Sequence, residues 1–148
     1  MPGSFAEAFP AEFTDDYPRN QIVPQEVFRV FIRRFNKEKR VLVVAVNEEA
    51  ETCVYTVINS DLNKNAVRPK LRPYHLPLCG DSSSFLEHDS FIDCSRLIET
   101  TIGFFVDEIL YEKGKPMGRC EDAVFNEVHS TLMTAPSVDR KIKIKYLQ

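Results

Sequence analysis

The chain has 148 residues, a length that suits a single domain with its own buried core. With 43% hydrophobic and 28% charged residues, the composition is that of a folded globular protein, which excludes disorder of the whole chain. The formal net charge of −3 argues against a broad basic surface that coats duplex DNA, although a local nucleic-acid cleft stays open. No run approaches the roughly 18 apolar residues of a membrane span, and no signal peptide is recognisable, so a cytoplasmic protein without membrane contact is expected.

Residues 1–24 are predicted to form an arm ahead of a single domain that spans residues 25–148. Four prolines interrupt this arm, and proline disfavours both helix interiors and strand ladders. Aromatic side chains recur at every fourth position from Phe5 to Tyr17. This spacing predicts no more than a short helix after Pro10, which either covers the protein's own core or binds a partner.

The region that follows the arm carries the clearest pattern and predicts a three-stranded antiparallel meander. The expected strands are residues 27–35, 40–46 and 52–58. The first and third are rich in β-branched and aromatic residues, and the second is an almost continuous apolar run typical of a central strand buried on both faces. The polar residues 36–39 are expected to form the hairpin loop between the first two strands.

Shorter strands are predicted beyond a polar loop at residues 59–72, which is expected to be exposed. The further expected strands are residues 74–78, 90–94 and 97–102. Pro77 places the first of these at a sheet edge, because proline cannot donate to a strand ladder. A turn is expected at residues 80–84.

The C-terminal part is predicted to be helical. Residues 104–111 and 122–133 have amphipathic helical spacing, and the glycine-containing segment 114–118 is expected to break the chain between them. Ser137 is a candidate cap for a last helix with Ile142 on its face. The alternation of lysine and apolar residues there also fits a strand, and helix is preferred.

Motif searches exclude several kinds of active site. The chain has no phosphate-binding glycine loop, no G-x-S-x-G elbow and no H-E-x-x-H pair, and its three histidines have no metal-site spacing. No cofactor and no metal are therefore expected. The four cysteines lack a C-x-x-C pair, so four reduced and mostly buried thiols are expected.

Polar side chains crowd between apolar residues around positions 88–90. His88, Asp89 and Ser90 are a candidate polar cluster that either satisfies a tight turn before a strand or performs acid–base chemistry. An unrelated small enzyme that uses His88, Asp89 or Cys94 is one reading of this segment.

The same segment carries a family resemblance. Residues 80–94 (GDSSSFLEHDSFIDC) resemble a Gly-Asp turn and a His-x-Ser-aromatic run in small bacterial proteins related to the PemK/MazF toxin group. The tail, from Phe125-Asn126-Glu127-Val128 to Ala135-Pro136 and the following Lys-Ile repeat, also resembles their C-terminal end. The likeness spans roughly residues 27–145.

The resemblance implies an α+β fold, namely a small antiparallel SH3-like β-barrel or strongly bent sheet with C-terminal helices, often as a homodimer. It implies a metal-independent endoribonuclease that acts on single-stranded RNA, with an antitoxin-like or other protein partner. Arg40 stands at the position of the family's catalytic arginine and Ser60 near that of its Ser/Thr. The expected nucleic-acid-binding residues are Arg33, Arg34, Lys64, Arg68, Lys70 and Arg72.

The sequence also departs from the family pattern. The toxins have a glycine- and glutamine-containing first loop and an Arg-Pro start to the second strand, whereas this chain has the short segment 36–39 followed by Arg40-Val41. A short loop leaves less chain to close over RNA. The alternative hypothesis is therefore a non-catalytic module on the same barrel that binds a protein or a nucleic acid.

Overall fold

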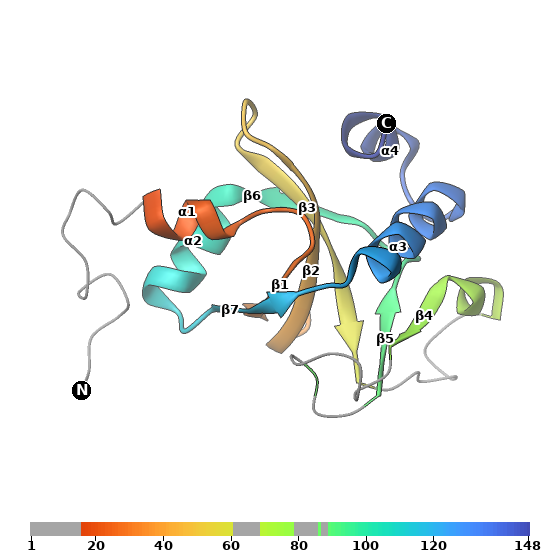
Figure 1. The fold of residues 1–148 in the computed structure, drawn as a ribbon, viewed down its shortest axis with the longest axis horizontal. Coiled ribbons are helices and arrows are strands. Elements are labelled where there is room, and N and C mark those ends of the chain that lie inside the picture. Colours follow the sequence, from red (N-terminus) through yellow and green to blue (C-terminus); the bar gives the residue numbers. More distant parts are fainter. Residues whose placement is uncertain (1–15, 61–68, 79–85, 87–88) are drawn as a thin grey trace.

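A computed structural model describes residues 16–60, 69–78, 86 and 89–148 and shows an antiparallel sheet flanked by helices (Figure 1). The strands are β1 Glu26–Ile32, β2 Lys37–Asn47, β3 Thr52–Asn59, β4 His75–Leu78, β5 Ser90–Asp93, β6 Ile98–Thr101 and β7 Lys115–Arg119. The helices are α1 Asp16–Gln21, α2 Ile102–Tyr111, α3 Asp122–Thr134 and α4 Arg140–Tyr146, with a 3₁₀ helix, η3, at Pro69–Tyr74.

The seven strands have the neighbour order β4-β5-β3-β2-β1-β7, and β6 pairs with β3 beside this path. Within the described residues the sheet stays open, with β4 at one end of this order and β7 at the other. The predicted α+β class is therefore confirmed in its form of a bent antiparallel sheet with C-terminal helices. Pro77 lies in the end strand β4, as predicted from its missing N–H donor.

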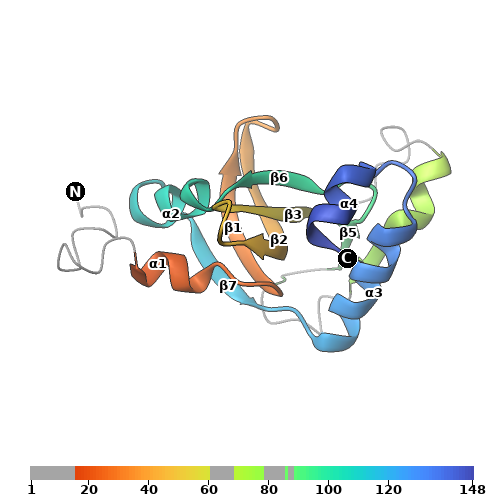
Figure 2. The ribbon, with the colours of Figure 1, turned by 90° about the horizontal axis from the view of Figure 1, so that it is seen from above.

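Both faces of the central strands are buried, which explains their near-continuous apolar sequence. Phe28 of β1 and Tyr55 of β3 pack around Phe105 of α2, with ring centroids 5.2 and 5.8 Å from that of Phe105. On the opposite face, Val27, Leu42, Val54 and Ile58 belong to a second cluster that contains Val128 and Leu132 of α3. Accordingly, α1 and α2 lie on one side of the strands, and α3 and α4 lie on the other (Figure 1, Figure 2).

The first hairpin turns earlier than the sequence predicted. The turn occupies residues 33–36, and β2 already begins at Lys37, whose register partner is Ile32. The polar residues of the expected loop can pair as strand because their side chains stay exposed or half-buried at this end of the hairpin. Arg40 consequently lies inside β2 rather than at its first position.

Two C-terminal details also differ from the prediction. The segment expected to break the chain after α2 contains β7, which pairs antiparallel with β1. The last helix is confirmed, but its cap is Asp139, whose carboxylate accepts from the Lys141 N–H at 2.7 Å, and not Ser137. Asp is as good an N-cap as Ser because its oxygen also reaches the second or third N–H.

The described part of the arm packs against the body. Helix α1 contacts α2, and Ile22, just beyond α1, is buried among the side chains around Phe105. Residues 1–15 of the arm, the turn expected at 80–84 and most of the polar loop lie outside the described residues. No helix in the described ranges is both long and apolar enough to cross a membrane.

Candidate functional site

Three cationic side chains occupy register positions on three neighbouring strands. Arg29 of β1 is the partner of Arg40 in β2 and also of Lys115 in β7. We call these three residues the basic row. Like charges directly opposite one another destabilise a sheet, so folding alone gives no reason for the row. The row therefore places three positive charges close together on neighbouring strands.

A cavity of about 260 Å³ adjoins the basic row. It is lined by Arg29, Glu38, Lys39 and Arg40, three cations against one carboxylate, so its net charge is positive. Glu38 pairs with Arg29 at an N–O distance of 2.5 Å, with both side chains 45% exposed. Exposed pairs of this kind are worth no more than about 1 kcal/mol, so this pair leaves Arg29 able to exchange Glu38 for a phosphate.

Lys39 ties the start of β2 to the end of β3. Its Nζ donates to the Asn59 Oδ1 at 2.8 Å. Burial, together with the positive charge of Lys37, lowers the pKa of Lys39. A poorly solvated ammonium gains from an added negative charge, and the cavity beside it is therefore suited to an anionic group.

Arg40 and Ser60 lie at the same end of neighbouring strands. Arg40 is opposite Ile58 in the β2–β3 register, and Ser60 follows two residues later as an exposed bend just past β3. Ser60 is not among the residues that line the cavity. The structure therefore brings the two predicted catalytic residues to one region of the sheet, while their roles stay predictions.

The other predicted RNA-binding residues are spread over the molecule. Arg33 and Arg34 are exposed in the β1–β2 turn. Lys70 and Arg72 are exposed in η3, which leads into β4 at the far end of the strand order from β1. Lys64 and Arg68 lie outside the described residues. The geometry therefore does not gather these basic side chains around Arg40.

The predicted polar cluster lies at a different place from the basic row. Asp89 and the buried Ser90 line a separate cleft of about 370 Å³ together with Pro77, Leu78 and Phe91. His88 lies outside the described residues. The nearby His75 instead ties η3 to β5, with its Nδ1 2.9 Å from the Leu71 carbonyl oxygen and its Nε2 3.2 Å from Asp93.

The described thiols are buried and unsuited to nucleophilic chemistry. Cys53, Cys94 and Cys120 are all free and buried, as the sequence predicted. Burial raises the pKa of Cys53 and Cys94 to about 12 and that of Cys120 to about 11. A thiol with such a pKa holds almost no thiolate at neutral pH, so Cys94 is a poor candidate nucleophile.

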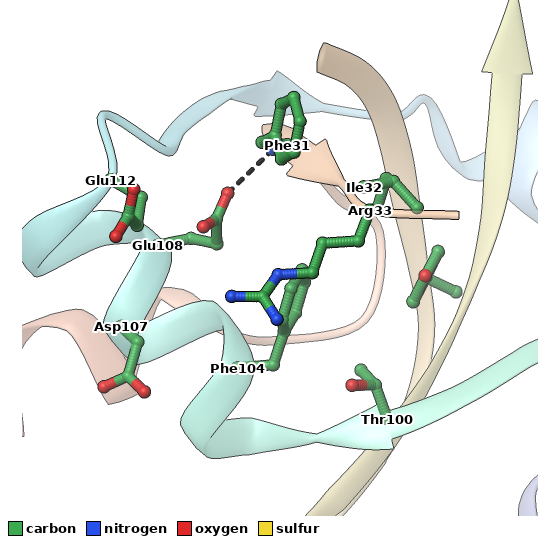
Figure 3. Close-up of a pocket in the computed structure, with 9 residues that line it drawn as sticks. Phe31, Ile32, Arg33, Thr100, Phe104, Asp107, Glu108 and Glu112 are labelled. Carbon is green, nitrogen blue, oxygen red and sulfur yellow. Dashed lines mark hydrogen bonds between the residues drawn. The ribbon is translucent and has the colours of Figure 1, made fainter. Parts of the chain in front are cut away.

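A larger cleft of about 550 Å³ lies between the end of β1 and helix α2 (Figure 3). It is lined by Phe31, Ile32, Arg33, Tyr55, Thr100, Phe104, Asp107, Glu108 and Glu112. We call it the α2 cleft. Arg33 extends into it beside Phe104 and toward the acidic side chains of the helix (Figure 3). The cleft therefore combines aromatic walls with hydrogen-bond donors and acceptors.

Glu108 is the buried polar group of the α2 cleft. Its side chain accepts a 2.7 Å hydrogen bond from the Phe31 N–H, and the residue is only 6% exposed. Burial raises the pKa of Glu108, the Phe31 bond opposes that shift, and the charges of Glu112, Glu38 and Asp107 add to it. The backbone after α2 approaches Glu108 closely, since a Cβ on Gly114 would lie 2.7 Å from the Glu108 Cβ.

Neither the cavity nor the cleft has the ligands of a metal centre. Within the described ranges, no group of three or more His, Cys, Asp or Glu residues is arranged to hold a metal ion.

Sequence reasoning missed Arg29, Lys39, Lys115 and the residues of the α2 cleft other than Arg33. Arg29 could have been noticed as the charged residue within the otherwise apolar run of residues 27–32. Its meeting with Lys115 depends on the pairing of β1 with β7, which joins segments far apart in the chain.

Comparison with known proteins gives a structural match only. No family model and no curated protein matches the sequence. A chain of the MazE-MazF structure from Deinococcus radiodurans matches with a TM-score of 0.52 and 9% identity, over 79% of this chain and 96% of that one. The Mycobacterium tuberculosis toxin MazF-mt6 matches with a TM-score of 0.52 and 14% identity, over 77% and 98%. At such identities the likeness concerns the fold, and the chain has a fold similar to that of the MazF toxins, as the resemblance of its sequence implied.

Proposed function

We propose that the protein is a toxin-like, metal-independent endoribonuclease that cuts single-stranded RNA at the cavity beside Arg40. The observation that carries the proposal is the meeting of Arg29, Lys39 and Arg40 in one cavity, at the strand end that Ser60 follows. The similarity of the fold to MazF toxins supports it.

The chemistry needs a positive group fixed where negative charge develops. The 2′-oxygen of the substrate bonds to phosphorus as the bond to the 5′-oxygen breaks, and the 2′-proton is finally transferred to the leaving oxygen. The phosphorane between these states carries extra negative charge, which the Arg40 guanidinium would stabilise from a rigid strand. Ser60 would donate to a phosphate oxygen, and Arg29, Lys39 and Lys115 would hold the neighbouring backbone.

The proposal includes partners and a setting. The Deinococcus structure is described as MazE-MazF, so an antitoxin-like protein partner is proposed for this chain as well. We further propose that the protein acts as a homodimer in the bacterial cytoplasm. Arg33 and Arg34 would extend the RNA path from the basic row, whereas Lys70 and Arg72 would contact only more distant nucleotides.

The test is cleavage of a long unstructured RNA in EDTA by the wild type and by Arg40→Ala. We expect metal-free cutting by the wild type and a loss of about 10²–10³-fold in the variant, the usual cost of removing one stabilising donor. Arg140→Ala is the matched control, because Arg140 is equally an arginine but is exposed at the start of α4. Equal cutting by all three proteins, or none by the wild type, would contradict the proposal.

A second candidate function is a non-catalytic binding module on the same fold. The β1–β2 turn favours it, because the four residues 33–36 provide little chain to close over RNA. Under this alternative the wild type would bind single-stranded RNA without cutting it, and Arg40→Ala would weaken that binding. Measuring binding and cleavage on the same RNA separates the two functions.

A further inference from the structure

We propose that the α2 cleft is a base-recognition site that holds one unpaired guanine of the RNA whose phosphate lies beside the basic row. This inference rests on the proposed function and adds a sequence preference to it. The site is built from Phe31, Arg33, Phe104 and Glu108.

The polar groups of the cleft match the edge of guanine. Guanine presents two adjacent donors, N1–H and the N2 amino group, beside the acceptors O6 and N7. A carboxylate accepts from both donors, and a guanidinium donates to the acceptors. Glu108 and Arg33 provide these two groups within one cavity. Adenine would instead turn its N1 lone pair toward the carboxylate.

The surroundings suit a flat aromatic ligand. The half-buried Phe104 gives the cleft an apolar ring surface, and unpaired bases in RNA complexes stack on such rings. A volume of about 550 Å³ is in the range of known small-ligand pockets. Asp107 and Glu112 at the same cleft repel phosphate, so a base would enter and its phosphate would stay outside.

Glu108 is a ligand group rather than only a structural one. Its Oε1 accepts from the Phe31 N–H, which fixes the carboxylate in place. No described residue bonds its Oε2, although the residue is only 6% exposed. Among the described residues, Oε2 is not one of the fully buried side-chain atoms that lack a partner, so it is accessible from the cleft and can accept from a ligand that carries donors.

A cationic side chain from a protein partner fits the cleft less well. Such a group would pair with the acidic residues but would meet the positive charge of Arg33, which already extends among them (Figure 3). A ligand with both donors and acceptors satisfies Arg33 and Glu108 together. The observations therefore favour a base over an arginine or lysine.

The α2 cleft and the basic row are close enough for one RNA strand to reach both. Phe31 lines the cleft, and its register partner Glu38 lines the cavity beside Arg40. Opposed residues on antiparallel strands have Cα atoms roughly 5 Å apart. The two sites therefore adjoin the same end of the β1–β2 hairpin, and we expect a base in the cleft to belong to a nucleotide near the one whose phosphate lies in the cavity.

The experiment measures binding, so that it does not depend on cleavage. Fluorescently labelled 2′-O-methyl heptamers of uridine, uncleavable because the 2′-OH is blocked, carry guanine, adenine, cytosine or inosine at the centre. We expect the guanine oligomer to bind about 5- to 150-fold more tightly than the adenine one, with inosine between them because it lacks the N2 amino group. Glu108→Gln, which keeps an acceptor for the Phe31 N–H, should remove most of this preference.

The controls separate the inference from the proposed function. Arg34→Ala, in the same turn as Arg33 but outside the cleft lining, should weaken all oligomers alike and keep the guanine preference, whereas Arg33→Ala should reduce it. Equal binding of all oligomers, or an unchanged preference in Glu108→Gln, overturns the base site while leaving the nuclease proposal standing.

If no oligomer binds, the proposed function fails, and titration with guanosine against adenosine then tests the cleft alone. Shifts of the Phe31 and Phe104 amide resonances with guanosine only would support a guanine site. Shifts with neither nucleoside, or only with an arginine-containing peptide, would overturn it.

Discussion

At the scale of single residues, Glu108 shows how a side chain can be held in place at a cost to stability. The Phe31 N–H and the close approach of Gly114 fix it, while burial and nearby carboxylates disfavour its charged form. Ionisable side chains whose pKa is shifted by burial, at a cost to the stability of the fold, are typical of functional sites. The inference drawn for the α2 cleft depends on this one carboxylate.

The raised pKa of Glu108 predicts a pH-dependent effect of Glu108→Gln. The folded pKa lies above the ordinary value of 4.5, so ionisation costs more in the folded than in the unfolded chain. The wild type should therefore lose stability relative to the variant as the pH rises from about 4.5 through the folded pKa, and the difference should be constant above it. Below pH 4 both side chains are neutral and the two proteins should be similar.

This prediction is checked by urea unfolding between pH 3.5 and 7.5. Glu49→Gln, at an exposed turn position, is the control and should show no comparable change. A Glu108→Gln protein that becomes less stable than the wild type as the pH rises would contradict the assigned sign.

At the scale of secondary-structure elements, the strands best predicted were those with local signals. β1, β2 and β3 are rich in apolar and β-branched residues, so the local sequence of each strand predicts its burial without knowledge of the strand it pairs with. β7 was missed because it contains proline and glycine and forms only through its pairing with β1. The residues of the candidate site divide in the same way. Arg40 was predicted from the family resemblance, whereas the places of Arg29 and Lys115 beside it depend on strand pairings that the sequence does not reveal.

Helix α4 is held to the sheet by a small polar cluster. The Tyr146 hydroxyl lies 2.5 Å from both the Glu99 Oε2 of β6 and the Thr52 Oγ1 of β3, and Lys145 Nζ bonds the same Glu99 oxygen at 2.9 Å. These contacts lower the pKa of Glu99. The cluster therefore connects the C-terminal helix to two strands.

Tyr146→Phe is expected to loosen α4. Loss of the hydroxyl bonds should reduce the free energy of unfolding by about 0.5–1.5 kcal/mol and speed amide exchange in α4 more than in β2. Tyr111→Phe is the matched control, because that tyrosine is 57% exposed and should change little. Hydrogen exchange that rises equally across the molecule, or not at all, would show that the cluster does not anchor the helix.

At the scale of the whole molecule, opposite charges are segregated despite a net charge of only −3. The basic row crosses β7, β1 and β2, and the acidic groups of the α2 cleft lie on the helix side of β1. Overall charge therefore gives little information about nucleic-acid binding here, because the local fields of the two regions have opposite sign.

The basic row predicts a defined dependence of RNA binding on salt, provided that the proposed function holds. Removing one cation that neutralises a phosphate of a single strand changes the slope of log K against log salt concentration by about 0.7. Lys115→Ala should therefore make the slope less negative by this amount, and Lys141→Ala, exposed on α4, should leave it unchanged. An unaltered slope in Lys115→Ala would remove that residue from the RNA surface.

The two strands at the ends of the sheet order each contain a proline, Pro77 in β4 and Pro116 in β7. A proline removes a backbone donor from an edge, so it hinders the addition of a further strand from another chain. These two described edges are thereby less open to the addition of a strand from another chain. A protein partner that meets these two edges is accordingly expected to contact side chains rather than to add a strand.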